Sequence, residues 1–249
     1  MRAAHSLLPI ILGLVLVPAG LAPAQYGDIS DLKVLAPKDK EDVKSVSPPA
    51  GAIVLFDGKN LDKWAKRNGK DEATWKLMPG GALQVSGGDI ITKQRFGGKY
   101  KLHVEFRVPY LPKASGQGRG NSGVYLQGRY EVQVLDSYGL MSKDNDCGGL
   151  YSVAAPKVNA CKLPTIWQSY DIEFSTGKTA DGKIVEPARV TVYHNGVKIH
   201  DDVKIMKDNT TAGMSSKELG GDPGTPGPIL LQDHGNPVQY RNIWLLPQK

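Results

Sequence analysis

The sequence predicts an all-β fold, a two-sheet antiparallel β-sandwich, and three observations lead to this prediction. Gly and Pro account for 29 and 17 of the 249 residues, and such a supply of chain-reversing residues favours many short strands over long helices. Short runs with one apolar and one polar face recur between turn residues, as half-buried strands require. No stretch keeps a sustained helical period of apolar residues, and the nearest approach is a short turn near residues 61–64.

The first expected strands are placed by the turn residues that bound them. A strand over residues 52–56 ends at Asp57-Gly58, and strands over 83–85 and 90–91 flank Gly87-Gly88. Residues 100–108 alternate most clearly, with Leu102 and Phe106 on one face and His103 and Glu105 on the other. Pro109 and Pro112 stop this strand, because proline cannot donate a ladder hydrogen bond.

The remaining expected strands follow the same logic. Residues 123–127 and 129–135 surround Gly128, and residues 170–175 alternate again. Asn195-Gly196 lies between runs over 189–194 and 197–200, and Asn-Gly is the strongest short hairpin signal. Runs over 229–231 and 240–246 complete the domain.

Composition and charge exclude several classes of protein. Hydrophobic residues make up 40% of the chain and charged residues 22%, so the chain is too apolar to be disordered throughout. Lys and Arg outnumber Asp and Glu by 31 to 25, a formal net charge of +6, but no run of five or more basic residues occurs. The footprint of a nucleic-acid-binding protein is missing, and we interpret the excess as a solvated basic surface.

Residues 1–24 have the features of a secretory signal peptide. Arg2 is followed by an apolar run over residues 7–17, and Ala22-Pro23-Ala24 forms a small-x-small cleavage pattern. The run is shorter than the roughly 20 residues of a membrane-spanning helix, so an uncleaved anchor is the weaker alternative. We therefore expect export to the periplasm or the extracellular medium, without a stable membrane anchor.

Two further expectations concern residues 25–50 and the cysteines. Residues 25–50 are rich in charge and poor in large apolar side chains, which predicts a flexible polar tail or linker before a domain over residues 51–249. In an oxidising compartment Cys147 and Cys161 are expected to form a disulfide. Neither lies in a zinc-ligand motif, and two free buried thiols are the alternative if the protein is cytosolic.

The polar faces of three expected strands carry acids, Arg, His and amides rather than the Lys, Thr and Ser of an ordinary solvated face. These residues are His103, Glu105 and Arg107 on one strand, Arg129, Glu131 and Gln133 on another, and Asp171 and Glu173 on a third. Such groups bind vicinal hydroxyls in carbohydrate-binding clefts. We expect them to share one sheet face, with salt-bridged cross-strand pairs as the alternative interpretation.

Residues 120–138 are the most informative segment. Glu131 and Gln133 share a face by the period of two, and a bulge at Val134-Leu135 would bring Asp136 to the same face. Two carboxylates flanking an amide would then line one groove, as acid and base catalysis at a glycosidic bond requires.

Several motifs, in this order, resemble the 3-keto-disaccharide hydrolase family over about residues 51–249. They are residues 54–64 (VLFDGKNLDKW), 121–138, 164–172 (PTIWQSYDI), the Asn195-Gly196 hairpin, and 227–235 (GPILLQDHG) with 241–244 (RNIW). The resemblance implies a concanavalin A-like lectin/glucanase jelly roll, with the substrate on a concave face. The spacing of Glu131, Gln133 and Asp136 is also similar to the Glu-x-Asp-x-x-Glu signature of laminarinase-type glycosidases, from which Gln133 and Asp136 depart.

The resemblance implies cleavage of a 3-keto-glycoside by elimination and water addition. We assign acid or base roles to Glu131 and Asp136, and enolate stabilisation to Arg129 or His234. We expect Trp167 to stack on sugar, and hydroxyl binding falls to the polar side chains His103, Glu105, Asn121, Gln133, Asp171 and Gln232.

Cofactor use and two other functions stay open. No cofactor is required, although a divalent ion held by His103, Glu131 or His234 could replace Arg129. A non-catalytic carbohydrate-binding module is the first alternative, because Gln133 stands where a glycosidase keeps a carboxylate. An ordinary β-glucanase is the second, and all three functions imply a glycoside or oligosaccharide partner.

Overall fold

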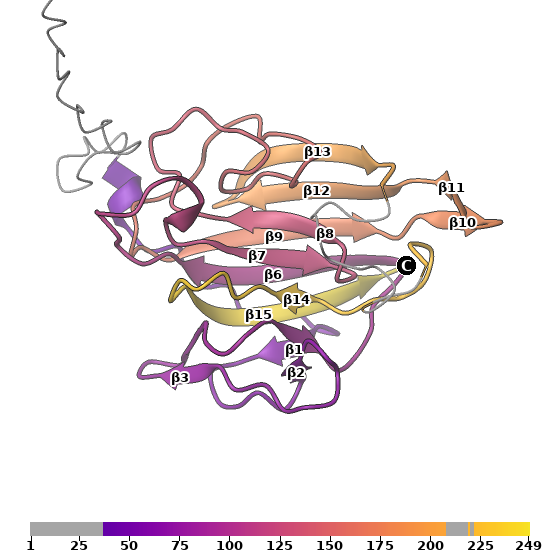
Figure 1. Cartoon of the computed structure of the whole chain (residues 1–249), viewed down its shortest axis with the longest axis horizontal. Helices are drawn as coiled ribbons and strands as arrows, with labels where there is room; N and C mark the ends of the chain where they lie inside the picture. Colours follow the sequence, from indigo (N-terminus) through magenta and orange to yellow (C-terminus); the bar gives the residue numbers. More distant parts are fainter. Residues whose placement is uncertain (1–36, 208–218, 220–221) are drawn as a thin grey trace, which may run out of the picture.

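The computed structural model describes residues 37–207, 219 and 222–249 (Figure 1). The predicted signal peptide, residues 1–24, and the first part of the predicted tail lie outside the described residues. Within the described ranges, no helix is long and apolar enough to cross a membrane.

The larger of two antiparallel sheets, sheet A, has eight strands in the order β13-β12-β9-β6-β15-β4-β3, with β1 paired to β15. Its strands are β1 (Ile53–Phe56), β3 (Lys76–Met78), β4 (Ala82–Gln84), β6 (Lys99–Arg107), β9 (Gln168–Ser175), β12 (Ala188–His194), β13 (Val197–Ile205) and β15 (Gln239–Gln248). Neighbours in this sheet are often distant in sequence, so the chain returns to it several times.

Sheet B has five strands in the order β2-β5-β14-β7-β8. They are β2 (Trp64–Lys66), β5 (Ile90–Thr92), β14 (Leu230–Leu231), β7 (Ser122–Leu126) and β8 (Tyr130–Val134). In Figure 1, β7, β8 and β14 overlie β6, β9 and β15, as two stacked sheets do. A separate hairpin, β10 (Lys178–Ala180) and β11 (Lys183–Glu186), and two short 3-10 helices, η2 (Pro37–Lys40) and η3 (Gly116–Gly118), complete the described elements. The predicted all-β jelly-roll sandwich is confirmed.

The hydrophobic core lies between the two sheets. Leu102, Val104 and Phe106 of β6 belong to it together with Val132 and Val134 of β8, and all five are fully buried. Since side chains alternate across a strand, the intervening residues of β6 and β8 lie on the outer faces of the two sheets. These outer faces therefore lie on opposite sides of the sandwich.

Most predicted strands are present, with shifted ends. Asn195 and Gly196 have φ values of 53° and 79°, as a type I′ turn requires, and they join β12 to β13. The sequence did not predict β2, β3, β10 and β11, which have only three or four residues each. For β2 a short turn was expected, but Trp64 is fully buried and its indole Nε1 donates to Leu55 O at 2.9 Å.

The described part of the predicted tail, residues 37–50, forms specific contacts with the domain; we call it the N-terminal segment. Val43 N donates to Trp167 O, and Trp167 N donates to Asp42 Oδ1, both at 2.9 Å. Ser45 Oγ donates to Glu105 Oε1 at 2.5 Å. Flexibility was predicted because residues 25–50 have few large apolar side chains to bury. In the structure, polar contacts rather than apolar burial hold the described part of this segment against the domain.

The predicted disulfide is absent, and both Cys147 and Cys161 are buried free thiols. Cys147 Sγ lies 3.2 Å from Tyr170 Oη, and a hydrogen bond with Cys147 together with burial raises the pKa of Cys161 well above its usual value. The two side chains therefore meet through a hydrogen bond rather than a covalent bond, as in the alternative of two buried thiols.

We expect two reduced thiols per chain. In denaturant without reductant, Ellman's reagent should titrate two equivalents, whereas the folded protein should react slowly because both sulfurs are buried. A Cys147→Ala variant is the control and should titrate one equivalent. A mass two daltons lower than that of the reduced chain, with no titratable thiol, would contradict the structure.

Candidate functional site

The predicted binding residues divide between the two outer faces of the sandwich. Glu131 and Gln133 belong to β8 in sheet B, whereas His103 and Glu105 belong to β6 and Asp171 to β9, both in sheet A. The prediction that all five share one groove is wrong. The period of two identifies residues on one side of a strand, but it does not identify the sheet that the strand joins.

On sheet A, the buried side chains of His103 and Glu105 form an ionic network with half-buried Asp171. His103 contacts Asp171 Oδ1 through Nδ1 at 3.0 Å and Glu105 Oε1 through Nε2 at 3.5 Å, and its ring stacks on Trp244 at 4.9 Å. Burial opposes the charged form of His103, but its hydrogen bonds to the two carboxylates raise its pKa.

The N-terminal segment and β15 cover this network. Arg241 Nε donates to Glu105 Oε2 at 2.6 Å, and Asn242 Nδ2 donates to Glu105 Oε1 at 2.7 Å. Trp167 is 5% exposed. The guanidinium of Arg241 lies over its ring in a cation–π contact, 4.1 Å from the ring centroid. The predicted stacking of Trp167 on sugar is not supported, because arginine already occupies the ring. We interpret this network as structural.

Glu105 predicts a loss of stability at acidic pH. Burial alone would raise its pKa, but hydrogen bonds from His103, Asn242, Ser45 and Arg241 lower the pKa to about 2, from a usual value of 4.5. Because the pKa of Glu105 is lower in the folded state than in the unfolded state, its ionised carboxylate stabilises the fold. This contribution is fully present above about pH 4.5 and is lost as the pH falls towards 2. We expect the free energy of unfolding, measured with urea, to fall by about 2 kcal/mol between pH 6 and 3 through this group.

A Glu105→Gln variant is the control for this titration. It should be less stable at pH 6, and its stability should fall less steeply between pH 6 and 3 than that of the parent. Identical slopes for the two proteins would show that Glu105 does not titrate as described.

On sheet B, Glu131 lies over the backbone of the neighbouring strand. Glu131 pairs in register with Tyr125, and Gln133 pairs with Gly123. A Cβ atom at Gly123 would lie 2.3 Å from Glu131 Oε1 and 2.8 Å from a ring carbon of Tyr125. Glycine is therefore required at position 123, since its missing side chain leaves the space for the carboxylate. Glu131 is 2% exposed.

Three amide side chains lie close to Gly123, over which this carboxylate lies: Gln133 on β8, Gln232 just after β14 and Asn121 in the loop before β7. Gln133 and Asn121 both donate to Gln117 Oε1, from Nε2 at 2.8 Å and from Nδ2 at 3.1 Å. Gln232 Nε2 donates to Tyr125 Oη at 3.0 Å. The carbonyl oxygens of Asn121, Gln133 and Gln232 are buried and have no hydrogen-bond partner among the described residues. Buried acceptors of this kind are suited to bind ligand hydroxyls.

Asp136 is bound to Arg119 in a buried ion pair. Arg119 donates to Asp136 Oδ2 from Nε at 3.1 Å and also from Nη2, and both side chains are 1% exposed. Burial raises the pKa of Asp136, although the hydrogen bond and charge of Arg119 oppose the rise. Val134 and Leu135 both pack in the core, so the alternation of β8 ends before Asp136. The contacts of Asp136 indicate a structural role and do not support its predicted role in proton transfer.

The two predicted cations lie in different loops. Arg129 is fully buried in the turn between β7 and β8, two residues before Glu131. Hydrogen bonds from Thr179 and Gly224 lower the pKa of Asp222, and the positive charge of Arg129 makes a smaller contribution in the same direction. His234 is exposed on the loop that follows β14. Arg129 is thus the predicted cation that adjoins Glu131 in the chain.

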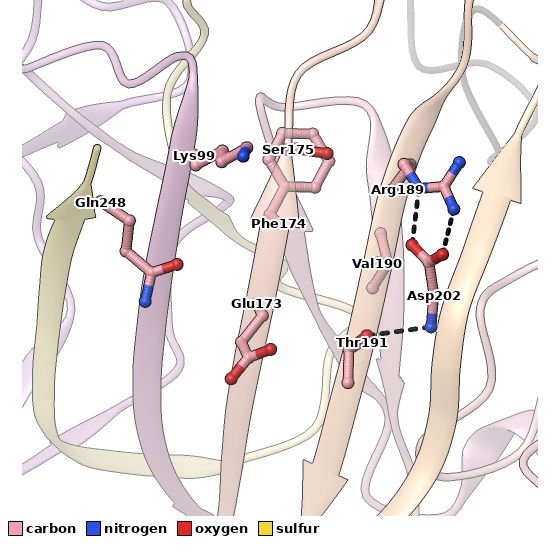
Figure 2. A pocket seen from close by; sticks show the side chains of 9 residues that line it. All are labelled: Lys99, Glu173, Phe174, Ser175, Arg189, Val190, Thr191, Asp202 and Gln248. Atoms are coloured by element: carbon pink, nitrogen blue, oxygen red, sulfur yellow. Dashed lines mark hydrogen bonds and ion pairs between the residues drawn. The ribbon is translucent and has the colours of Figure 1, made fainter.

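A shallow hollow of about 320 Å³ lies on the outer face of sheet A (Figure 2). Exposed polar side chains line it, including Lys99, Glu173 and Gln248, and Arg189 Nε donates to Asp202 Oδ1 at 2.6 Å. The side chains predicted to catalyse the reaction are not among its lining residues, so we do not assign the reaction to this hollow.

The predicted metal ligands also divide between the faces, because His103 is in sheet A and Glu131 in sheet B. In the part of the chain that the structure describes, no group of three or more His, Cys, Asp or Glu side chains lies close enough together to hold a metal ion.

Sequence reasoning missed Gln117, Arg119 and Tyr125 as parts of this region. Tyr125 could have been found, since it alternates with Gly123 on the strand beside Glu131. Gln117 and Arg119 lie in the loop around η3 (Gly116–Gly118), and no periodic pattern marks such residues.

Comparisons with known proteins support a carbohydrate-active family. Residues 51–246 match the family described as the 3-keto-alpha-glucoside-1,2-lyase-like domain. A candidate glycosyl hydrolase from Parabacteroides distasonis is 34% identical, covering 86% of this chain and 97% of that one, with a TM-score of 0.70. A second from the same organism is 19% identical, covering 80% and 95% of the two chains, with a TM-score of 0.55. No curated protein matches the sequence. The chain therefore belongs to the 3-keto-alpha-glucoside-1,2-lyase-like family, a carbohydrate-active group, and folds as a two-sheet antiparallel β-sandwich.

Proposed function

We propose that this protein cleaves 3-keto-glycosides on the outer face of sheet B, with Glu131 as the acid-base group. Family membership supports a glycosidase-like, carbohydrate-active enzyme. The observation that carries the finer proposal is the buried carboxylate of Glu131, beside three amide side chains with unpartnered carbonyl oxygens. A carboxylate provides proton transfer, and the acceptors provide sugar binding.

The ketone at C3 of the substrate makes cleavage by elimination possible. A carbonyl at C3 acidifies the hydrogen on C2, and the glycosidic oxygen on C1 is then a leaving group β to the carbonyl. Glu131 removes the C2 proton, the C1–O bond breaks as the C1–C2 double bond forms, and the leaving oxygen takes a proton. Water then adds across the double bond and gives the free 3-keto sugar, so atoms and electrons balance without an oxidant or reductant.

We assign enolate stabilisation to Arg129 rather than His234. A fixed positive charge near the developing oxyanion lowers the barrier to proton removal. Arg129 is buried two residues from Glu131 on the same hairpin, whereas His234 is solvent-exposed. Arg129→Met should therefore lower kcat much more than His234→Gln, and equal effects would refute this assignment.

The direct test compares 4-nitrophenyl 3-keto-α-D-glucoside with its unoxidised parent. We expect nitrophenol release from the ketone alone. Binding without release from either compound would favour a carbohydrate-binding module, the function favoured by Gln133 in place of a carboxylate. Cleavage of unoxidised glucan would indicate a β-glucanase. That function is disfavoured by the pairing of Asp136 with Arg119, because retaining glycosidases need two carboxylates about 5–5.5 Å apart at the bond.

We also propose that the protein is exported through residues 1–24, as the sequence pattern of that segment supports. Expression of the full chain followed by N-terminal sequencing of the exported protein tests this. A mature chain that begins at Gln25 is expected, and an intact Met1 in the cytosolic fraction would refute it.

A further inference from the structure

We infer that Gln117 is a positioning residue that turns two amides of the site into hydrogen-bond acceptors, so that the site selects neutral sugars that donate hydroxyl protons. This inference rests on the proposed function, because it assumes that a sugar binds the outer face of sheet B. It adds Gln117, which lies outside the sequence motifs, to the residues of the candidate site, and it restricts the substrates to neutral sugars.

The contacts of Gln117 fix the orientation of both amides. Its Oε1 accepts from Gln133 Nε2 at 2.8 Å and from Asn121 Nδ2 at 3.1 Å, and its Nε2 donates to Asn145 O at 2.8 Å. Asn121 Nδ2 also donates to Gln117 O at 2.9 Å, and Gln133 Nε2 approaches Asn145 O at 3.3 Å. A rotation of either amide by 180° would oppose two carbonyl oxygens, so Gln117 allows one orientation.

This orientation leaves oxygen atoms for the ligand. With their NH2 groups bound, Asn121 and Gln133 retain carbonyl oxygens that have no partner among the described residues, and these side chains are 2% and 1% exposed. Gln232 also retains its oxygen, because its Nε2 donates to Tyr125. An unpaired buried acceptor is costly, which favours a ligand that donates to it.

These acceptors flank the carboxylate. Gln133 pairs in register with Gly123, Gln232 N donates to Gly123 O, and Glu131 Oε1 lies over Gly123. Strand β7 lies between β8 and β14, and neighbouring strands are about 4.8 Å apart. The acceptors on β8 and just after β14 are therefore spread over roughly two strand spacings and can contact different hydroxyls of one bound glycoside. An anionic sugar such as a uronate would place its charge against this array of oxygens, and it is therefore disfavoured.

The kinetic test uses Gln117→Met, which keeps the length of the side chain and removes both of its polar groups. With 4-nitrophenyl 3-keto-α-D-glucoside we expect KM to rise about tenfold, as for the loss of about one oriented hydrogen bond, with kcat within threefold of the parent. Gln117→Glu keeps an acceptor for both amides and should restore most of the affinity. Gln239→Met is the matched control, because Gln239 holds Gln84 and Arg107 on sheet A, and its KM should stay within twofold.

A second measurement does not depend on turnover. In ¹⁵N NMR spectra, hydrogen exchange of the Asn121 and Gln133 side-chain NH2 groups should accelerate at least tenfold in Gln117→Met. Unchanged exchange would overturn the positioning role, and accelerated exchange with an unchanged KM would overturn the link to ligand selection. If the parent does not cleave the ketone, the proposed function fails, while the exchange result still decides whether Gln117 positions the amides.

Discussion

Replacing Glu131 with Gln is expected to lower kcat for a 3-keto-glucoside by about 10²–10⁴-fold, the usual contribution of a general acid or base. Gln keeps the size of the side chain but cannot accept the C2 proton. Because Glu131 lies over Gly123 and beside Tyr125, an isosteric replacement should preserve packing. Nitrophenol release under saturating substrate measures the loss, and circular dichroism and thermal unfolding establish that the variant is folded.

The matched control for this experiment is Glu173→Gln, which removes an exposed carboxylate from β9 on the opposite side of the sandwich. We expect its kcat to remain within twofold of the parent value. A folded Glu131→Gln protein with the activity of the parent would remove Glu131 from the chemistry and would require a different base.

Replacing Asp136 with Leu is expected to lower the free energy of unfolding by about 3–5 kcal/mol, because the variant leaves Arg119 buried without its carboxylate. Arg119 and Asp136 are each 1% exposed, so water does not solvate the remaining guanidinium as it would at the surface. Urea unfolding at neutral pH measures the change.

The double variant Arg119→Met, Asp136→Leu separates a structural role of this pair from a catalytic role. Replacing both charges with apolar side chains should recover most of the stability lost in the single variant, because it removes the uncompensated charge. An Asp136→Leu protein as stable as the parent but inactive would instead place Asp136 in the catalytic machinery.

The fold could be predicted from sequence to the extent that it depends on local alternation and turns. The alternation of residues 100–108 identified β6 and its buried face, and Asn195-Gly196 identified the β12–β13 hairpin. Strands as short as β2 and β3 have too few residues for a period to appear. Their positions are set by pairing with distant segments, such as β2 with β5.

The candidate site could be predicted only in part, because its chemistry depends on which strands are neighbours. Glu131 and Gln133 were predicted to share a face, and they do alternate on β8. Gln232 was predicted only as a hydroxyl-binding residue, and it lies just after β14, the strand that pairs with β7. His103 and Asp171 carry the same kind of polar groups, but their strands pair with each other in sheet A. The sequence also did not reveal that Ser45 of the N-terminal segment bonds to Glu105.

The claim that the chain cleaves its substrate by elimination is tested most directly by running the reaction in D2O with a 3-keto-glucoside that carries protium at C2. We expect the released 3-keto-glucose to carry deuterium at C2, because the C2 proton leaves through Glu131 and exchanges with solvent before water adds. A parallel incubation of 3-keto-glucose with the Glu131→Gln protein measures spontaneous exchange. Rapid bond cleavage that yields 3-keto-glucose with protium retained at C2 would rule out cleavage by elimination.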